Sequence, residues 1–390
     1  MQKKLFYFQI ATISTFIFAL LAGTWFNYRF DQIRPYSKNS LRLHEHEVLI
    51  ASVGNFNGQF QSIIYPTQLD MQGSQVTLGG IPLLQSYLKI IKERFGTKSV
   101  ILQLGQWFSN EKLDFSKNPE QMELVKALPI DFSLFSYHEL INFFPNGLYQ
   151  TELPELPQNF INSNIYSLKD RTHLKGEKLA PYAIARANGH KIGIIGISDR
   201  ELISKDLPAG AYFSDSVASF LLARKKLMKQ SVDGIILLVQ FSSDSRDNNK
   251  HVNEFLKRIP PRSIDLVISP ASESNPPIIR GTPILWTTAM GQEINWVIMN
   301  FDENDKPKVT FLPSVATCQK INSLNRRCIS NQSASKIIAE NFIMAAINDA
   351  IPATFLGREI VPVEIDFMRQ ATNNEQTSFP NTLVSDQAGK

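Results

Sequence analysis

Hydrophobic positions in this chain recur as short runs that alternate with amphipathic segments. After Gly79-Gly80, Leu83, Leu84, Tyr87, Leu88 and Ile91 share one face, which predicts a helix. Short apolar runs bounded by Gly, Asn or Ser predict buried strands. The predicted strands are 47–52, 99–104, 131–135, 192–197, 234–239, 264–269, 283–287 and 296–301, and further helices are predicted at 119–128, 214–230 and 249–258. This alternation favours a layered α/β domain over an all-β sandwich.

The N-terminus begins with a long apolar run. Residues 5–26 contain no charged side chain, follow Lys3-Lys4 and precede Arg29. Such a run is long enough to cross a bilayer as a helix, and the preceding lysines favour an inside N-terminus. We expect residues 1–28 to form a transmembrane signal anchor; a signal peptide cleaved near Ala22 is the alternative. Either way, the domain is expected to be extracytoplasmic (periplasmic or at the cell surface). Its expected partners are the membrane, through the N-terminal helix, and a second protein of the cell envelope.

The rest of the chain divides by composition. A polar stalk (29–45) leads to the main domain (46–317), a cysteine-containing loop with a helical extension (318–368) and a polar tail (369–390) expected to be disordered. Cys318 and Cys328 form a close pair, which in an exported chain predicts a disulfide. Closing a loop of about ten residues would stabilise the fold by roughly 2–3 kcal/mol.

Size and charge narrow the function classes. With 390 residues, 43% of them hydrophobic, the chain can bury the core of one large domain. The net charge of +4 is small, and no Lys/Arg stripe with interleaved aromatic residues is present. Nucleic acid is therefore not an expected partner.

Several segments resemble, in order, the motifs of a phosphoesterase family. They are Gly79-Gly80-Ile81, "MELVKALPIDFSLFSYHEL" (122–140), Asn162-Ser163-Asn164-Ile165, "APYAIARANGHKIGIIGIS" (180–198), "VDGIILLVQFS" (232–242) and "IDLVISPASES" (264–274). On these segments, residues 48–302 resemble the metallophosphatase (calcineurin-like phosphoesterase) domain of the 5′-nucleotidase family. The resemblance implies a four-layer fold, an α/β sandwich of two sheets flanked by helices.

The same resemblance implies a site for two divalent metal ions, yet all seven ligand positions differ. Where the family has carboxylates, histidines and one asparagine, this chain has Asn55, Asn57, Gln106, Tyr137, Gln240, Ala271 and Glu273. Two divalent cations need anionic ligands or imidazoles, and only Glu273 carries a charge. Amides both donate and accept hydrogen bonds, so they can satisfy one another without a metal. No metal or other cofactor is therefore expected.

Three hypotheses follow for function. The first is a pseudoenzyme that acts by binding or assembly at the membrane. The second is an active phosphoesterase or nucleotide hydrolase with atypical ligands, in which a divalent metal pair would still bind. The third is a receptor that binds a neutral ligand, such as a sugar or nucleoside, in the former metal pocket. His138 keeps the position of the family's catalytic histidine; it is either an acid or base paired with Glu139 or a structural remnant.

Overall fold

The computed structural model describes residues 41–66, 75–108, 119–144, 147–148, 155–198, 210–241, 245–270, 278–301 and 306–318. The predicted N-terminal anchor, most of the stalk, Cys328, the helical extension and the tail lie outside these ranges, as do Ala271 and Glu273. Within them, no helix is both long and apolar enough to cross a membrane. The described residues from Leu43 onward belong to one compact unit.

The first sheet is mixed and has the order β17-β16-β1-β4-β5-β6-β8 within the described residues. Its parallel strands are β1 (Glu47–Val53), β4 (Ser99–Gln103), β5 (Phe132–Leu134), β6 (Phe160–Ile161) and β8 (Leu179–Ala180). β16 (Glu293–Asn300) pairs antiparallel with β1, and β17 (Lys308–Ala316) pairs antiparallel with β16.

The second sheet has the order β14-β15-β13-β12-β10-β9 in the same part of the chain. Its parallel strands are β10 (His190–Ser198), β12 (Gly234–Gln240), β13 (Leu266–Pro270) and β15 (Thr282–Thr287). Antiparallel strands β9 (Tyr182–Ala187) and β14 (Ile278–Ile279) lie at its two edges. Two small ribbons pair β2 (Ile63–Pro66) with β3 (Gln75–Leu78), and β7 (Ile165–Ser167) with β11 (Ala211–Phe213).

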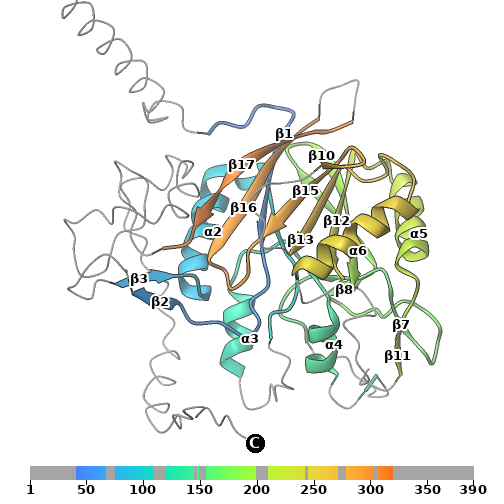
Figure 1. The fold of residues 1–390 in the computed structure, drawn as a ribbon, viewed down its shortest axis with the longest axis horizontal. Coiled ribbons are helices and arrows are strands. Elements are labelled where there is room, and N and C mark those ends of the chain that lie inside the picture. Colours follow the sequence, from blue (N-terminus) through green and yellow to red (C-terminus); the bar gives the residue numbers. More distant parts are fainter. Residues whose placement is uncertain are drawn as a thin grey trace, which may run out of the picture. The chain divides into compact units, whose positions relative to one another are not determined.

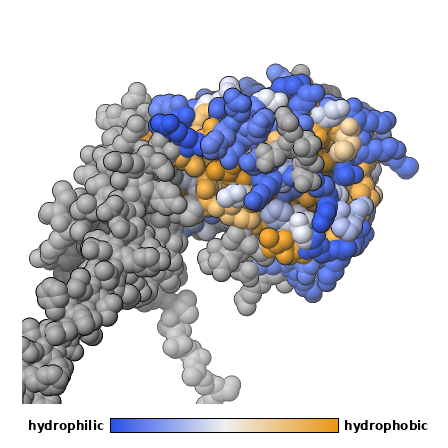
Figure 2. All heavy atoms as spheres, turned by 90° about the horizontal axis from the view of Figure 1, so that it is seen from above, coloured by the Kyte–Doolittle hydropathy of each residue, from blue (hydrophilic) through white to orange (hydrophobic). Residues whose placement is uncertain are grey.

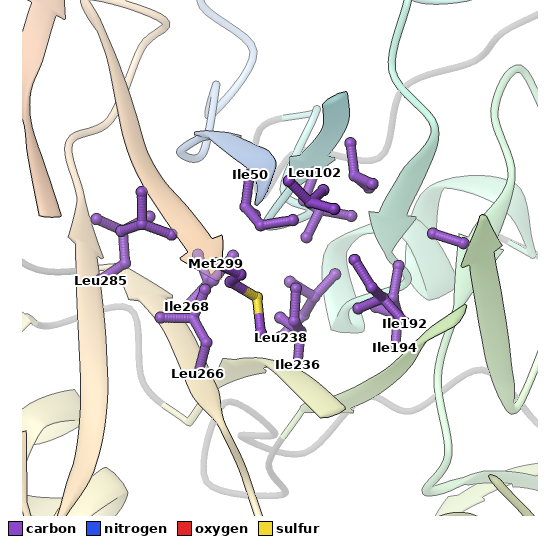
Figure 3. Close-up of a cluster of buried hydrophobic side chains, with 14 of the residues drawn as sticks. Ile50, Leu102, Ile192, Ile194, Ile236, Leu238, Leu266, Ile268, Leu285 and Met299 are labelled. Atoms are coloured by element: carbon purple, nitrogen blue, oxygen red, sulfur yellow. The ribbon is translucent and has the colours of Figure 1, made fainter. Parts of the chain in front are cut away.

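The main hydrophobic core lies between the two sheets (Figure 3). Ile50 and Leu102 of the first sheet and Ile236, Leu238 and Ile268 of the second belong to one buried cluster. Because side chains alternate along a strand, the intervening residues of β12 point to the opposite face. Because both faces of these strands are buried, their sequences are continuous apolar runs rather than alternating apolar and polar residues.

Helices cover the outer faces of the sheets (Figure 1). α5 (Ser216–Met228) and α6 (Ser245–Arg258) lie side by side and pack on the second sheet through Phe220, Leu227 and Phe255. α2 (Ile81–Phe95) contacts β4 of the first sheet. α3 (Pro119–Lys126) and α4 (Tyr137–Phe143) complete the helices of the described part. The predicted α/β class and the helix–sheet–sheet–helix order of layers are both observed.

Each helix and strand that the sequence predicts in the described part of the chain is present. Several strands at the edges of the sheets were not predicted. β17 contains Pro313, which argues against a strand when the sequence is considered alone. In the fold β17 pairs only with β16, at the edge of the sheet, where proline is tolerated.

The face of the molecule in Figure 2 is mainly hydrophilic, with smaller hydrophobic patches.

Candidate functional site

Three of the seven singled-out residues meet where the parallel strands of both sheets end. Asn55 follows β1, Gln106 follows β4, and Gln240 is the last residue of β12. All three are buried, with exposures of 7%, 6% and 0%. The loops at the carboxyl ends of parallel strands are the usual place for ligands in such sheets.

One oxygen atom joins the three side chains. Oε1 of Gln106 accepts a hydrogen bond from Nδ2 of Asn55 at 2.7 Å and another from Nε2 of Gln240 at 2.7 Å. These two bonds use both acceptor sites of that oxygen. We refer to Asn55, Gln106 and Gln240 as the amide triad.

The backbone around Gln106 fixes its position. The carbonyl oxygen of Gln106 accepts hydrogen bonds from the amides of Phe56 (3.1 Å) and Asn57 (2.9 Å), which ties the two loops together. Gly105 and Gln106 have φ angles of 73° and 56°, a left-handed turn that disfavours most residues other than glycine. Gln103 supports this turn, because its side chain accepts from the amide of Gly105 and donates to the carbonyl of Gly105, each at 2.6 Å.

The loop after β1 is also held from the other side. The amide of Met290 donates to the carbonyl of Asn55 at 2.5 Å. A Cβ atom on Gly54 would lie 1.8 Å from the carbonyl oxygen of Thr288, so only glycine fits there. The backbone of 288–290 thus closes on the loop that carries Asn55.

The other singled-out residues do not join the triad. Asn57 is exposed in a turn with φ 53°. Tyr137 is half-buried at the start of α4, with its ring 5.6 Å from the ring of His138. Ala271 and Glu273 lie outside the described residues, so their place in the pocket stays a prediction.

His138 is buried at the start of α4, with 2% of its surface exposed. Neither ring nitrogen has a hydrogen-bond partner among the described residues. Burial lowers the pKa of His138, and the nearby charge of Glu139 opposes that shift. The imidazole is therefore held in its neutral form over a wider pH range than a free histidine.

Glu139 holds local structure together. Its carboxylate accepts from the backbone amide of Trp107 at 2.8 Å, the backbone amide of Ser136 at 2.9 Å and the hydroxyl of Ser136 at 2.5 Å. The bond from the backbone amide of Ser136 is one half of the capping box of α4, while the bond from Trp107 anchors the loop that contains Gln106. No hydrogen bond joins the side chains of His138 and Glu139, because the carboxylate is directed at these donors, and an acid or base role for His138 stays a prediction.

A second polar cluster adjoins the triad and was not singled out from the sequence. Ser198 of β10 pairs in register with Gln240. Its hydroxyl accepts from Asn162 at 2.8 Å, and its amide donates to Asn164 at 3.1 Å. In the sequence, the two asparagines of segment 162–165 follow a short apolar run, and they are the signal for this cluster; the structure shows that both are buried.

Solved structures of three enzymes share this fold. NAD nucleotidase from Haemophilus influenzae is 15% identical, with 78% of this chain and 62% of that one covered and a TM-score of 0.54. A 5′-nucleotidase precursor from Thermus thermophilus is 15% identical, with 70% of this chain and 55% of that one covered and a TM-score of 0.54. A sulfate thiohydrolase from Thermus thermophilus is 14% identical, with 75% of this chain and 60% of that one covered and a TM-score of 0.54. The chain has the metallophosphatase fold of the 5′-nucleotidases.

This metallophosphatase-like chain spans 55–62% of the length of those structures. Its sequence matches no protein-family model, and no curated protein is detectably similar to it. At such low identity the similarity establishes the fold alone.

The described residues of the site do not fit the metal pair that the resemblance implies. The triad is neutral, and Gln106 Oε1 has both acceptor sites occupied by amide donors. Both oxygens of the nearby buried carboxylate, Glu139, are engaged by backbone and hydroxyl donors. In the described ranges, no group of three or more His, Cys, Asp or Glu side chains is placed to hold a metal ion. Within the described part of the chain, the triad thus offers two divalent cations none of the anionic or imidazole ligands that they need.

Proposed function

We propose that this protein is a catalytically inactive metallophosphatase-like protein, a pseudoenzyme that acts by binding or assembly. It is anchored by its N-terminal segment, with the domain outside the cytoplasm. The observation that supports inactivity best is the shared acceptor atom of the triad, Gln106 Oε1. Amide-to-amide bonds occupy the position where the resembled family would hold metal ligands.

The chemical argument concerns charge. In dinuclear hydrolysis, metal ions lower the pKa of an attacking water and stabilise the negative charge of the transition state. Neutral amides supply neither function. His138, which would assist such a reaction, is buried without a hydrogen-bond partner in the described part of the chain. We therefore expect no metal-assisted phosphoester hydrolysis.

Hydrolysis assays test this proposal. The full-length chain, purified in detergent, is incubated with bis(p-nitrophenyl) phosphate and with 5′-nucleotides in the presence of Mn²⁺. We expect no turnover above the buffer rate, and the same result for His138→Ala. Turnover in the native chain that His138→Ala abolishes would support the alternative, an active phosphoesterase or nucleotide hydrolase with atypical metal ligands.

A second candidate function is the binding of a neutral ligand at the triad. Oδ1 of Asn55 and Oε1 of Gln240 are buried acceptors without a partner among the described residues. Buried acceptors of this kind are normally satisfied by water or by a ligand. Hydroxyl-rich or amide-bearing molecules, such as sugars and nucleosides, would supply the donors. A thermal-shift screen with both classes tests this function; a shift that Gln240→Leu removes would support it, and no shift with either class would leave assembly alone.

A further inference from the structure

The outer face of α5 exposes an unusual number of large apolar side chains. Leu221, Leu222 and Met228 are 38%, 43% and 49% exposed. Of the five large hydrophobic residues exposed in the described part of the chain, three therefore lie on this one helix. The opposite face of α5 is buried in the core through Val217, Phe220, Ala223 and Leu227, so the exposed residues are not needed for packing.

The same outer face is cationic. Lys225, Lys226 and Lys229 are exposed, and residues 216–232 contain no Asp or Glu. Helical spacing places Lys225 and the following Lys229 between Leu222 on one side and Leu221 and Met228 on the other. Apolar and basic side chains are thus interleaved on one surface.

A neighbouring loop extends this surface. Leu168 is 52% exposed, and three basic residues, Lys169, Arg171 and Lys175, are exposed beside it together with one acidic residue, Asp170. The positive charges of Lys226 and Lys175 both act on His173, whose pKa is lowered first by burial and then by these two charges. The loop follows β7, whose partner strand β11 leads into α5, and the hydroxyls of Ser214 and Ser219 are hydrogen-bonded at 2.6 Å. We call residues 168–175 together with the exposed side chains of residues 216–229 the α5 surface.

We infer that the α5 surface binds an anionic lipid surface. Interleaved lysines and aliphatic side chains suit a bilayer, because the ammonium groups reach the lipid phosphates while Leu and Met enter the acyl boundary. A purely electrostatic partner such as nucleic acid would not require exposed leucines. No acidic side chain lies on α5, and the single acidic residue of the loop, Asp170, is outnumbered by the exposed basic side chains, so the α5 surface keeps a net positive charge toward anionic headgroups.

This inference is independent of the amide triad and of catalytic status. It adds a second membrane contact, made by the folded domain itself, to the anchor proposed for the N-terminal segment. An anchor alone would leave the orientation of the domain undefined. Contact through the α5 surface would hold the domain in one orientation against the bilayer.

Site-specific fluorescence tests the inference on the full-length chain. Ala218→Cys places a thiol on the exposed face of α5, and Lys89→Cys places one on the exposed face of α2 as a control. Each is labelled with an environment-sensitive fluorophore and reconstituted into phosphatidylcholine vesicles with or without about one third phosphatidylglycerol. Spin-labelled lipids then report how close each label lies to the bilayer.

We expect quenching at position 218 in anionic vesicles to be at least about threefold greater than at position 89. Two lysines contribute roughly a 30-fold preference for an anionic surface, so Lys225→Gln/Lys229→Gln should reduce quenching at 218 to the level of the control. The charge-matched double variant Lys89→Gln/Arg94→Gln on α2 should leave it unchanged. Equal quenching at 218 and 89, or quenching at 218 that persists in pure phosphatidylcholine or in Lys225→Gln/Lys229→Gln, would overturn the inference.

Discussion

Gln240 donates a hydrogen bond to Oε1 of Gln106 at 2.7 Å, although 134 residues separate them in the sequence. The bond joins the end of β12 in the second sheet to the loop after β4 in the first. Asn55 donates to the same oxygen, so two loops and the end of β12 are linked by neutral side chains. Among the described residues, these three side chains form a hydrogen-bonded part of the core.

The triad should contribute measurably to stability. Gln106→Met keeps the length of the side chain but removes the shared acceptor, which leaves the amide donors of Asn55 and Gln240 buried without their partner. Each buried donor without a partner destabilises the folded state by about 1–3 kcal/mol, so we expect a decrease of about 2–4 kcal/mol in the free energy of unfolding. Urea denaturation at neutral pH measures this change.

Asn57→Gly is the matched control for that experiment. Asn57 is exposed, and its φ of 53° suits glycine, so its replacement should change the free energy of unfolding by less than about 0.5 kcal/mol. Similar small effects for Asn57→Gly and Gln106→Met would mean that the triad bonds contribute little to stability.

Glu139 should behave as a structural carboxylate. In Glu139→Gln one acceptor oxygen becomes a donor, which would face the backbone amide of Trp107 or the donors of Ser136. We expect a loss of about 2–4 kcal/mol in the free energy of unfolding, since charge-assisted bonds to buried groups are lost. A loss smaller than about 1 kcal/mol would argue against this role.

The sequence was sufficient to predict the layers of the fold and the proximity of Asn55, Gln106 and Gln240, but not the contacts between them. Strand ends placed Asn55, Gln106 and Gln240 near one another because parallel strands of the resembled fold end at a common edge. The left-handed turn at Gln106 could not be predicted, since its cause is the closure of the loop on Phe56 and Asn57. For Glu139, adjacency in the sequence suggested a pair with His138, whereas the helix cap determined where the carboxylate lies.

Burial of His138 predicts a pH dependence of stability. An unfolded histidine has a pKa near 6.5, and burial lowers the native value, so below about pH 6.5 the unfolded chain binds more protons than the native one. The free energy of unfolding should therefore fall as pH decreases, by up to about 1.4 kcal/mol per pH unit for this group. Denaturation between pH 7.5 and 5 should show a shallower decrease in His138→Phe; equal slopes in the two proteins would contradict the account.

The predicted disulfide can be tested directly. Cys318 is fully buried and is not a free thiol, and both its amide and its carbonyl are hydrogen-bonded to the hydroxyl of Tyr87. Mass spectrometry of unreduced peptides should find Cys318 linked to Cys328. Reduction should lower the free energy of unfolding by roughly 2–3 kcal/mol. Recovery of either cysteine as a free thiol in the native protein would contradict the prediction.

Metal binding tests the central claim most directly. Equilibrium dialysis of the full-length chain against micromolar Mn²⁺ or Zn²⁺, followed by elemental analysis, gives the number of ions bound per chain. A neutral triad whose shared oxygen already accepts two hydrogen bonds predicts substantially less than one ion per chain, in both the native protein and Gln106→Met. Two ions bound per native chain, lost on substitution of Gln106, would contradict the account.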